Sequence, residues 1–317
     1  MMNRNLLYKI LTLTVFAVSI GFAQSKITSE DLLIMNDSVK LPGTLTYNSE
    51  LKSQPLVIFV HGSGNVDRNG NQMMMNANAN YIKMLNDSLV SKGIAFYRYD
   101  KRTATQSNLK FLMNGMSFDG FVEDVNLTIN KFKNDNRFSS IILIGHSQGA
   151  LVSMLVDHAH VDKYISLAGP SHSVDKTIIG QVRRQNGDSI ATIVESHFKE
   201  LATTGSIEKV DPNLISLFNK PTQPFMASWM KYNPTEEIKK VNLPILILNG
   251  DKDIQVSVDD AERLHEVNKK SEKVIIENMN HVLKTIENDS ENLPSYSSPD
   301  FPLSQKLVST IEAFIKQ

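Results

Sequence analysis

The feature that most constrains this chain is an apolar run followed by Gly-His-Ser-Gln-Gly at residues 145–149. The apolar run predicts a buried strand, and the residues after the motif predict a helix. A strand, a sharp turn and a helix around a serine are typical of a nucleophile elbow. The serine of such a turn has a strained backbone, so side chains at Gly145 and Gly149 would collide with the neighbouring strand and helix. Ser147 is the candidate nucleophile, and the helix N-terminus directs the Gln148 N–H toward a developing oxyanion.

Composition excludes several classes of function. The net charge of the 317 residues is −1, so no general attraction to nucleic acid or to an anionic membrane is expected. Neither a Walker-type phosphate loop nor a dinucleotide-binding glycine fingerprint occurs. The chain has no cysteine, which excludes disulfides, thiolate metal sites and a cysteine nucleophile.

The N-terminus has the pattern of a secretory signal. Arg4 and Lys9 give a positive start, and residues 10–23 form a short, largely apolar run. This run is too short for a membrane span of about 20 residues. We expect no stable membrane insertion once the signal is removed.

Gly21 and Ala23 are small residues at the two positions that a signal peptidase reads, so cleavage is expected after Ala23. This divides the chain into a signal peptide, residues 1–23, and a mature hydrolase domain, residues 24–317. The mature protein would be periplasmic or secreted. The alternative is an uncleaved anchor, because two leucines extend the apolar run.

The rest of the chain alternates buried strands with amphipathic helices. This order predicts an α/β fold with a mostly parallel central sheet and helices on both faces. Two strands joined by a turn-rich stretch predict an antiparallel start. Besides the elbow strand, the expected strands are 32–35, 39–46, 56–60, 94–99, 164–168, 244–250 and 273–277, and the expected helices 81–92, 118–132, 258–268 and 302–316.

One long stretch interrupts the alternation. Residues at about 172–241 carry helical signals and no strand-like run. Their place in the order predicts a helical cap over the carboxyl ends of the strands, where ligands bind in open α/β sheets. Residues 289–302 are rich in Ser, Asn, Asp and Pro, and predict a loop.

His281 is the candidate general base. It is the one of the eight histidines that follows the last expected strand in a short loop. Its position after Ser147 and Asp253 matches the order nucleophile, acid, base of an elbow-type hydrolase.

Asp253 is the candidate acid, because the preceding glycine lets the strand turn outward and the carboxylate can reach the ring of His281. Asp251 is the competitor, since it could instead cap the turn through the backbone. Asp175 is a third candidate, after the preceding strand.

Backbone N–H groups of Ser63 and Gln148 are the candidate oxyanion donors. Ser63 lies in His-Gly-Ser-Gly (residues 61–64) after a buried strand, where glycines allow close approach to a substrate. A plain glycine-rich turn is the alternative. His61 is expected to brace this loop.

Nothing in the sequence indicates a cofactor or a metal site. The histidines are dispersed and no His-Glu-x-x-His motif occurs. The methionine cluster at 73–75 is interpreted as loop packing. Within the cap, Phe225, Met226 and Trp229 are candidates for an apolar acyl wall, although core packing explains them about as well.

These residues resemble the α/β-hydrolase family, and the resemblance covers residues 26–317. Finer features are similar to bacterial carboxylesterases related to the serine aminopeptidase-like hydrolases. They imply hydrolysis of short-chain acyl esters without a cofactor. The motifs that carry it are His61-Gly62-Ser63-Gly64 with Asp67-Arg68, Tyr99-Asp100-Lys101-Arg102, Gly145-His146-Ser147-Gln148-Gly149, Asn249-Gly250-Asp251-Lys252-Asp253 and residues 225–234. One departure is Thr103-Ala104-Thr105-Gln106-Ser107, where the family usually has glycines.

The sequence therefore predicts a secreted serine carboxylesterase acting on a small acyl-ester substrate. A thioesterase, a peptidase or a cell-wall deacetylase would use the same chemistry. A peptidase that cleaves at free amino termini should direct cap carboxylates, such as Glu195, Glu200 and Glu208, toward the nucleophile. A different class is an exported binding protein that keeps the fold without the chemistry.

Overall fold

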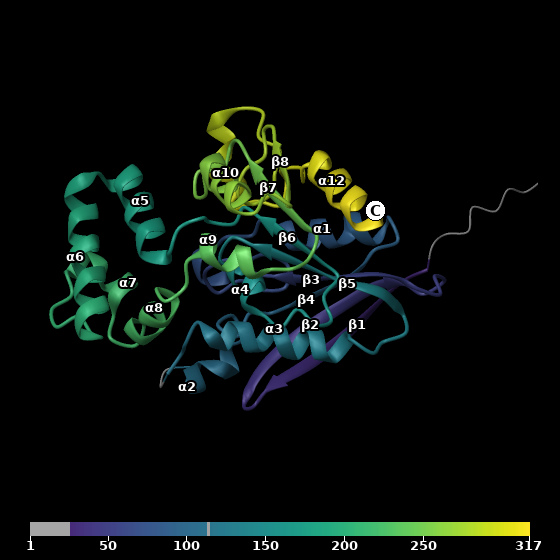
Figure 1. Cartoon of the computed structure of the whole chain (residues 1–317), viewed down its shortest axis with the longest axis horizontal. Coiled ribbons are helices and arrows are strands. Elements are labelled where there is room, and N and C mark those ends of the chain that lie inside the picture. The colour runs from purple at the N-terminus through teal and green to yellow at the C-terminus, as the bar shows by residue number, and fades with distance from the viewer. Residues whose placement is uncertain (1–25, 113–114) are drawn as a thin grey trace, which may run out of the picture.

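A central sheet of eight strands organises the chain (Figure 1). The computed structural model describes residues 26–112 and 115–317. The expected signal peptide and its cleavage site lie outside the described residues. Within them, no helix combines the length and apolar composition needed to cross a bilayer.

The strand order is β1-β2-β4-β3-β5-β6-β7-β8. β1 pairs antiparallel with β2, and β2 pairs antiparallel with β4. All other neighbouring pairs are parallel, which confirms the mostly parallel sheet and its antiparallel start. The bounds are β1 Ile27–Asn36, β2 Val39–Asn48, β3 Gln54–Val60, β4 Ala95–Tyr99, β5 Phe138–His146, β6 Lys163–Leu167, β7 Ile245–Gly250 and β8 Glu272–Ile276.

Strand β3 shows why the sheet is buried on both faces. Its residues 56–60 are all apolar and at most 3% exposed. Because successive side chains alternate between faces, Val57 and Phe59 join one core, and Leu56 and Ile58 join the other. The apolar run therefore supplies two cores at once, as expected for a central strand.

Helices cover the two faces (Figure 1). α1 (Tyr81–Val90) and α12 (Gln305–Lys316) pack in one core, and α3 (Asp119–Phe132), α4 (Gln148–Leu155) and α10 (Val258–Val267) pack in the other. The carboxyl ends of the parallel strands are thereby left for the connecting loops.

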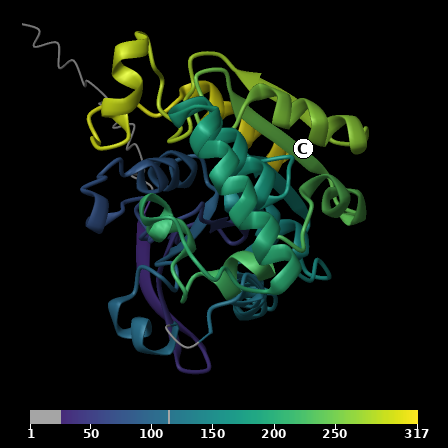
Figure 2. The same ribbon diagram turned by 90° about the vertical axis from the view of Figure 1, so that its left-hand side faces the viewer.

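A helical segment stands between β6 and β7, and Figure 2 shows its two longest helices in front of the rest of the molecule. α5 and α6 pack against each other, and the shorter helices return the chain to the sheet. We call this segment the cap; its helices are α5 Val174–Asn186, α6 Asp188–Thr204, α7 Ile215–Phe218, α8 Gln223–Trp229 and α9 Pro234–Glu237.

Two local expectations differ from the structure, and one short helix had no counterpart among the expected elements. The stretch expected as a loop contains a short 3-10 helix, Asp289–Glu291, and α11, Asn292–Ser295. A further short helix, α2 (Leu109–Leu112), follows β4. Met73 and Met75 are 72% and 73% exposed, so they do not pack in their loop as interpreted.

Candidate active site

Ser147 sits at the turn between β5 and α4 with φ 54° and ψ −121°. A non-glycine residue at positive φ stores roughly 1–3 kcal/mol of strain, which the surroundings must offset. A Cβ at Gly145 would lie 2.5 Å from the carbonyl oxygen of Gly149, and one at Gly149 would lie 2.2 Å from the carbonyl oxygen of Val60. The two glycines are therefore required by backbone contacts.

Asp253 and His281 form a buried pair after β7 and β8. Nδ1 of His281 donates to Oδ2 of Asp253 at 2.7 Å, and the two side chains are 6% and 1% exposed. The other carboxylate oxygen of Asp253 accepts from the N–H groups of Gln255 and Val256, at 2.8 and 2.9 Å. Both oxygens are thus engaged, so the carboxylate is fixed and the imidazole is oriented by it.

The competing acids have other positions. Asp251 accepts a hydrogen bond from the backbone N–H of Asn278 at 2.7 Å, which ties the turn after β7 to the turn after β8. Asp175 lies in the first turn of α5, in the cap. The carboxylate that contacts His281 is that of Asp253 alone among the described residues.

His146 links the elbow to the loop of His281. Its Nε2 donates to the carbonyl oxygen of His281 at 2.9 Å, and the two rings lie 4.8 Å apart between centroids. Burial and the neighbouring His281 hold the pKa of His146 well below its usual value, so the ring is neutral. Among the described residues, no hydrogen bond joins Ser147 to His281. Such a contact between a nucleophile and its base often forms only when substrate binds.

His61 packs in the loop after β3 and takes no part in this pair. Its ring is buried and lies edge-on to Tyr99, with centroids 4.7 Å apart. Burial, with a smaller contribution from Lys101, lowers the pKa of His61 to about 3. A neutral, packed ring fits the expected bracing role.

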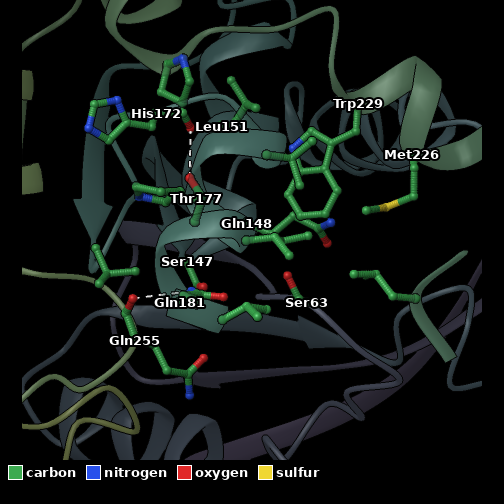
Figure 3. A pocket seen from close by; sticks show the side chains of 17 residues that line it. Ser63, Ser147, Gln148, Leu151, His172, Thr177, Gln181, Met226, Trp229 and Gln255 are labelled. Carbon is green, nitrogen blue, oxygen red and sulfur yellow. Dashed lines mark hydrogen bonds between the residues drawn. The ribbon is translucent and has the colours of Figure 1, made fainter. Parts of the chain in front are cut away.

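The residues of the candidate oxyanion donors, Ser63 and Gln148, line the same cavity as Ser147 (Figure 3). Gln148 is the first residue of α4, so its N–H has no acceptor within that helix. A Cβ at Gly62 would lie 3.1 Å from the Cβ of Ser147, which shows how closely the loop before Ser63 approaches the elbow.

The cavity has a volume of about 410 Å³ and lies between the cap and the elbow. Ser63, Ser147 and Gln148 lie at one part of its wall, and most of the remaining wall is apolar. In Figure 3, Trp229 and Met226 extend from the cap toward it. The other lining residues are Leu151, Pro170, His172, Val174, Thr177, Ile178, Gln181, Val182, Leu217, Pro234, Gln255 and Val256.

Phe225 is a correction. Its side chain is buried and packs edge-on to Phe121, with centroids 5.6 Å apart, and it does not line the cavity. The assignment to the acyl wall was therefore wrong for this residue, and the core-packing alternative holds.

Sequence reasoning missed two sets of residues. Val174, Ile178 and Val182 lie four residues apart on one face of α5 and line the cavity. Their spacing was a usable signal of one apolar helix face. The second is Lys101, which is 5% exposed and donates to Gly62 and Gln148. Its motif was recognised, but no pattern in the sequence marked it as buried.

The described residues hold no cluster of three or more His, Cys, Asp or Glu side chains suited to a metal ion. The arrangement that is present, a strained serine, an oriented imidazole and N–H groups at a cavity, suits nucleophilic acyl transfer.

Comparisons with known proteins show what the chain is similar to. A family model described as serine aminopeptidase, S33, matches residues 74–217, which include Ser147 but neither Asp253 nor His281. Esterase EstD of Thermotoga maritima is 26% identical over 232 residues, which cover 70% of this chain and 52% of that protein. The match thus spans about half the length of this curated relative.

Two solved structures illustrate the fold. Est1E from Butyrivibrio proteoclasticus, in a complex with ferulic acid, has a TM-score of 0.59 and 19% identity and covers 90% of this chain and 100% of its own. The Pyrococcus furiosus esterase Pf2001 has a TM-score of 0.57 and 18% identity and covers 92% of this chain and 91% of its own. The chain has the α/β-hydrolase fold. Its sequence is similar to that of an esterase and, over residues 74–217, to the serine aminopeptidase family.

Proposed function

We propose that the chain is a serine carboxylesterase that hydrolyses short-chain acyl esters through an acyl-enzyme on Ser147. One observation carries the proposal. Ser147, in a strained elbow, faces an apolar cavity, and the imidazole of His281 is oriented by the carboxylate of Asp253. The loop that carries His281 is joined to the elbow by a hydrogen bond from His146 to the His281 carbonyl oxygen.

The reaction follows from the assigned groups. Nε2 of His281 takes the proton of Ser147 as its hydroxyl oxygen attacks the ester carbonyl carbon. The Ser63 and Gln148 N–H groups donate to the oxyanion of the tetrahedral intermediate. His281 then protonates the departing alkoxide. Water, deprotonated by His281, attacks the acyl-enzyme, and His281 returns the proton to the Ser147 oxygen as the acid is released. The Asp253 carboxylate holds the ring throughout.

The cavity supports a small apolar acyl group as substrate. Its volume is at the lower end of the range of about 300–1,000 Å³ typical of ligand pockets. Trp229 and Met226 from the cap form part of the wall, and the ring of Trp229 stacks on Phe118 at 5.2 Å between centroids. A wall fixed in this way favours short chains over long ones.

The test is a series of p-nitrophenyl esters, from acetate through butyrate and octanoate to palmitate, with a fluorophosphonate probe for the nucleophile. We expect the highest kcat/KM at the short end, and labelling that Ser147→Ala abolishes. Ser196→Ala, in cap helix α6, is the matched control and should label as wild type. An unlabelled wild-type protein, or equal labelling of Ser147→Ala, would reject the proposal.

An aminopeptidase is the second candidate, favoured by the family model that matches residues 74–217. The expected carboxylates do not support it. Glu200 accepts from the Glu208 N–H at 2.7 Å, Glu195 lies 3.9 Å from Arg183, and none of the three lines the cavity. Aminoacyl p-nitroanilides assayed beside the esters distinguish the two activities. Faster turnover of the anilides would favour the peptidase.

We also propose that the protein is exported, on the pattern of residues 1–23. Expression of the full chain in a bacterial host, followed by fractionation and N-terminal sequencing, tests this. The expected product begins at Gln24 outside the cytoplasm. Intact protein that starts at Met1 in the cytoplasmic fraction would contradict it.

A further inference from the structure

A buried ammonium group lies between the two segments that carry the candidate oxyanion donors. Lys101 follows β4 and is 5% exposed. Its Nζ donates to the carbonyl oxygen of Gly62 at 2.6 Å and to Oε1 of Gln148 at 2.5 Å. The ring of Phe121 lies 4.3 Å from Nζ and covers it from another side.

The bond to Gly62 determines the direction of an N–H group. The carbonyl of Gly62 and the N–H of Ser63 belong to one peptide unit, and in a trans peptide they point in opposite directions. Holding the oxygen toward Lys101 therefore turns the Ser63 N–H away from Lys101. The same lysine holds the side chain of Gln148, whose backbone N–H is the other candidate donor.

Lys101 has no direct ion-pair partner in the part of the chain that the structure describes. The nearby carboxylate of Asp124 is bound by Arg102, whose Nε and Nη2 each donate to it at 2.6 Å. Burial lowers the pKa of Lys101 to about 7, because removing an ammonium from water is unfavourable. An apolar side chain would usually fill such a position at less energetic cost. A lysine here fits a role that needs its donors.

We propose that Lys101 is a positioning residue for ester hydrolysis. Its ammonium holds the Gly62–Ser63 peptide and the Gln148 side chain, so that both N–H groups converge on the oxyanion of the substrate. This inference rests on the function proposed above. Lys101 lies behind the donors and contacts no reacting atom, so it acts through Ser63 and Gln148.

The test is Lys101→Met, which keeps the length of the side chain and removes its donors. Loss of one oxyanion donor typically lowers turnover by roughly 10²–10³. Lys101→Met keeps both N–H groups and removes only the ammonium that positions them. We therefore expect kcat to fall by about 10- to 100-fold, with KM within about twofold of the wild-type value. Binding of a phenylboronic acid, which mimics the tetrahedral intermediate when it adds to Ser147, should weaken by a similar factor.

Lys163→Met is the matched control. Lys163 also donates to a backbone carbonyl, that of Phe314 at 2.7 Å, and its Nζ lies 5.2 Å from the ring of Phe314. It stands at the start of β6, the opposite end of the strand from the site. We expect an altered melting temperature and an unchanged kcat. A loss of kcat in this variant equal to that of Lys101→Met would overturn the assignment.

Gln148→Met tests the inference if Lys101→Met does not fold. It removes one acceptor of Lys101 and retains the Gln148 N–H. We expect a smaller loss of kcat, and a double variant that loses less than the product of the two single losses.

The possible failures are distinguishable. A wild-type protein inactive on every acyl substrate rejects the proposed function and this inference with it. An active wild type, with kcat of Lys101→Met or of Gln148→Met within threefold of it, rejects the inference alone.

Discussion

Replacement of Asp253 by Asn tests the orientation of the base most directly. The exchange conserves shape at a side chain that is 1% exposed. The Asn oxygen can still accept from the N–H groups of Gln255 and Val256, which now hold Oδ1 of Asp253. The amide NH₂ then faces Nδ1 of His281 and forces that nitrogen to be the acceptor. The proton of the ring moves to Nε2, which can no longer take the proton of Ser147.

The expected magnitude is large. The same exchange in a serine protease triad lowers kcat about 10⁴-fold, because the tautomer is wrong and the imidazolium loses its carboxylate. For Asp253→Asn we expect a loss of about 10³–10⁴, which corresponds to roughly 4–5.4 kcal/mol at 1.36 kcal/mol per tenfold change. The melting temperature should change little, because the fixed oxygen keeps both of its backbone bonds.

The assay is steady-state hydrolysis of p-nitrophenyl butyrate, with Asp251→Asn as the matched control. The Asp251 side chain accepts from the Asn278 N–H, which the Asn oxygen can still do, so this replacement should leave both kcat and stability close to those of the wild type. Retention of more than a tenth of the wild-type kcat by Asp253→Asn would refute the reasoning. An equal loss in Asp251→Asn would refute the choice between the two acids.

Three further changes have defined outcomes. Gly149→Ala places a Cβ 2.2 Å from a backbone oxygen, so we expect a melting temperature many degrees lower. Gly180→Ala is the control: the nearest atom to its Cβ would lie at 3.6 Å, so this variant should be neutral or slightly stabilising. Equal melting curves for the two variants would contradict the steric account. Trp229→Ala enlarges the cavity, so the ratio of kcat/KM for octanoate to that for butyrate should rise; an unchanged ratio would remove Trp229 from the acyl wall. Burial lowers the pKa of Lys101 from 10.5 to about 7. Between these two pH values the folded chain binds fewer protons at Lys101 than the unfolded chain does, so the contribution of Lys101 to the free energy of unfolding rises with pH. Urea titrations of wild type and Lys101→Met from pH 6 to about 9.5 should show the wild type gaining relative to the variant, and a constant difference would contradict the lowered pKa.

The sheet and the elbow were predictable because their signals are local. Apolar runs of strand length, and glycines on both sides of Ser147, express sterics that act within a few residues. The structure confirms the expected sheet, and its backbone distances at Gly145 and Gly149 bear out the steric argument. Asp253 could be preferred over Asp251 for a similar reason, since the turn geometry after a glycine decides which carboxylate reaches the next loop.

The remaining features depend on contacts between distant segments. Lys101 is buried because the loop of Gly62, the start of α4 at Gln148 and the ring of Phe121 surround it, and a strand-end lysine carries no mark of that in sequence. Phe225 was misplaced because distant contacts decide which side chains of α8 pack in the core, and Phe225 packs against Phe118 and Phe121. Short helices in the stretch 289–302 were missed because their composition is that of a turn-rich loop.

The order of the elements has a consequence for synthesis. Ser147 precedes the cap and strands β7 and β8, whereas Asp253 follows β7 and His281 follows β8. A growing polypeptide therefore carries its serine for more than a hundred residues before the imidazole is translated. Until β7 and β8 have paired with the sheet, no base stands ready to remove the hydroxyl proton. Under the proposed mechanism, the chain therefore stays inert toward acyl groups in its surroundings until both strands are in place.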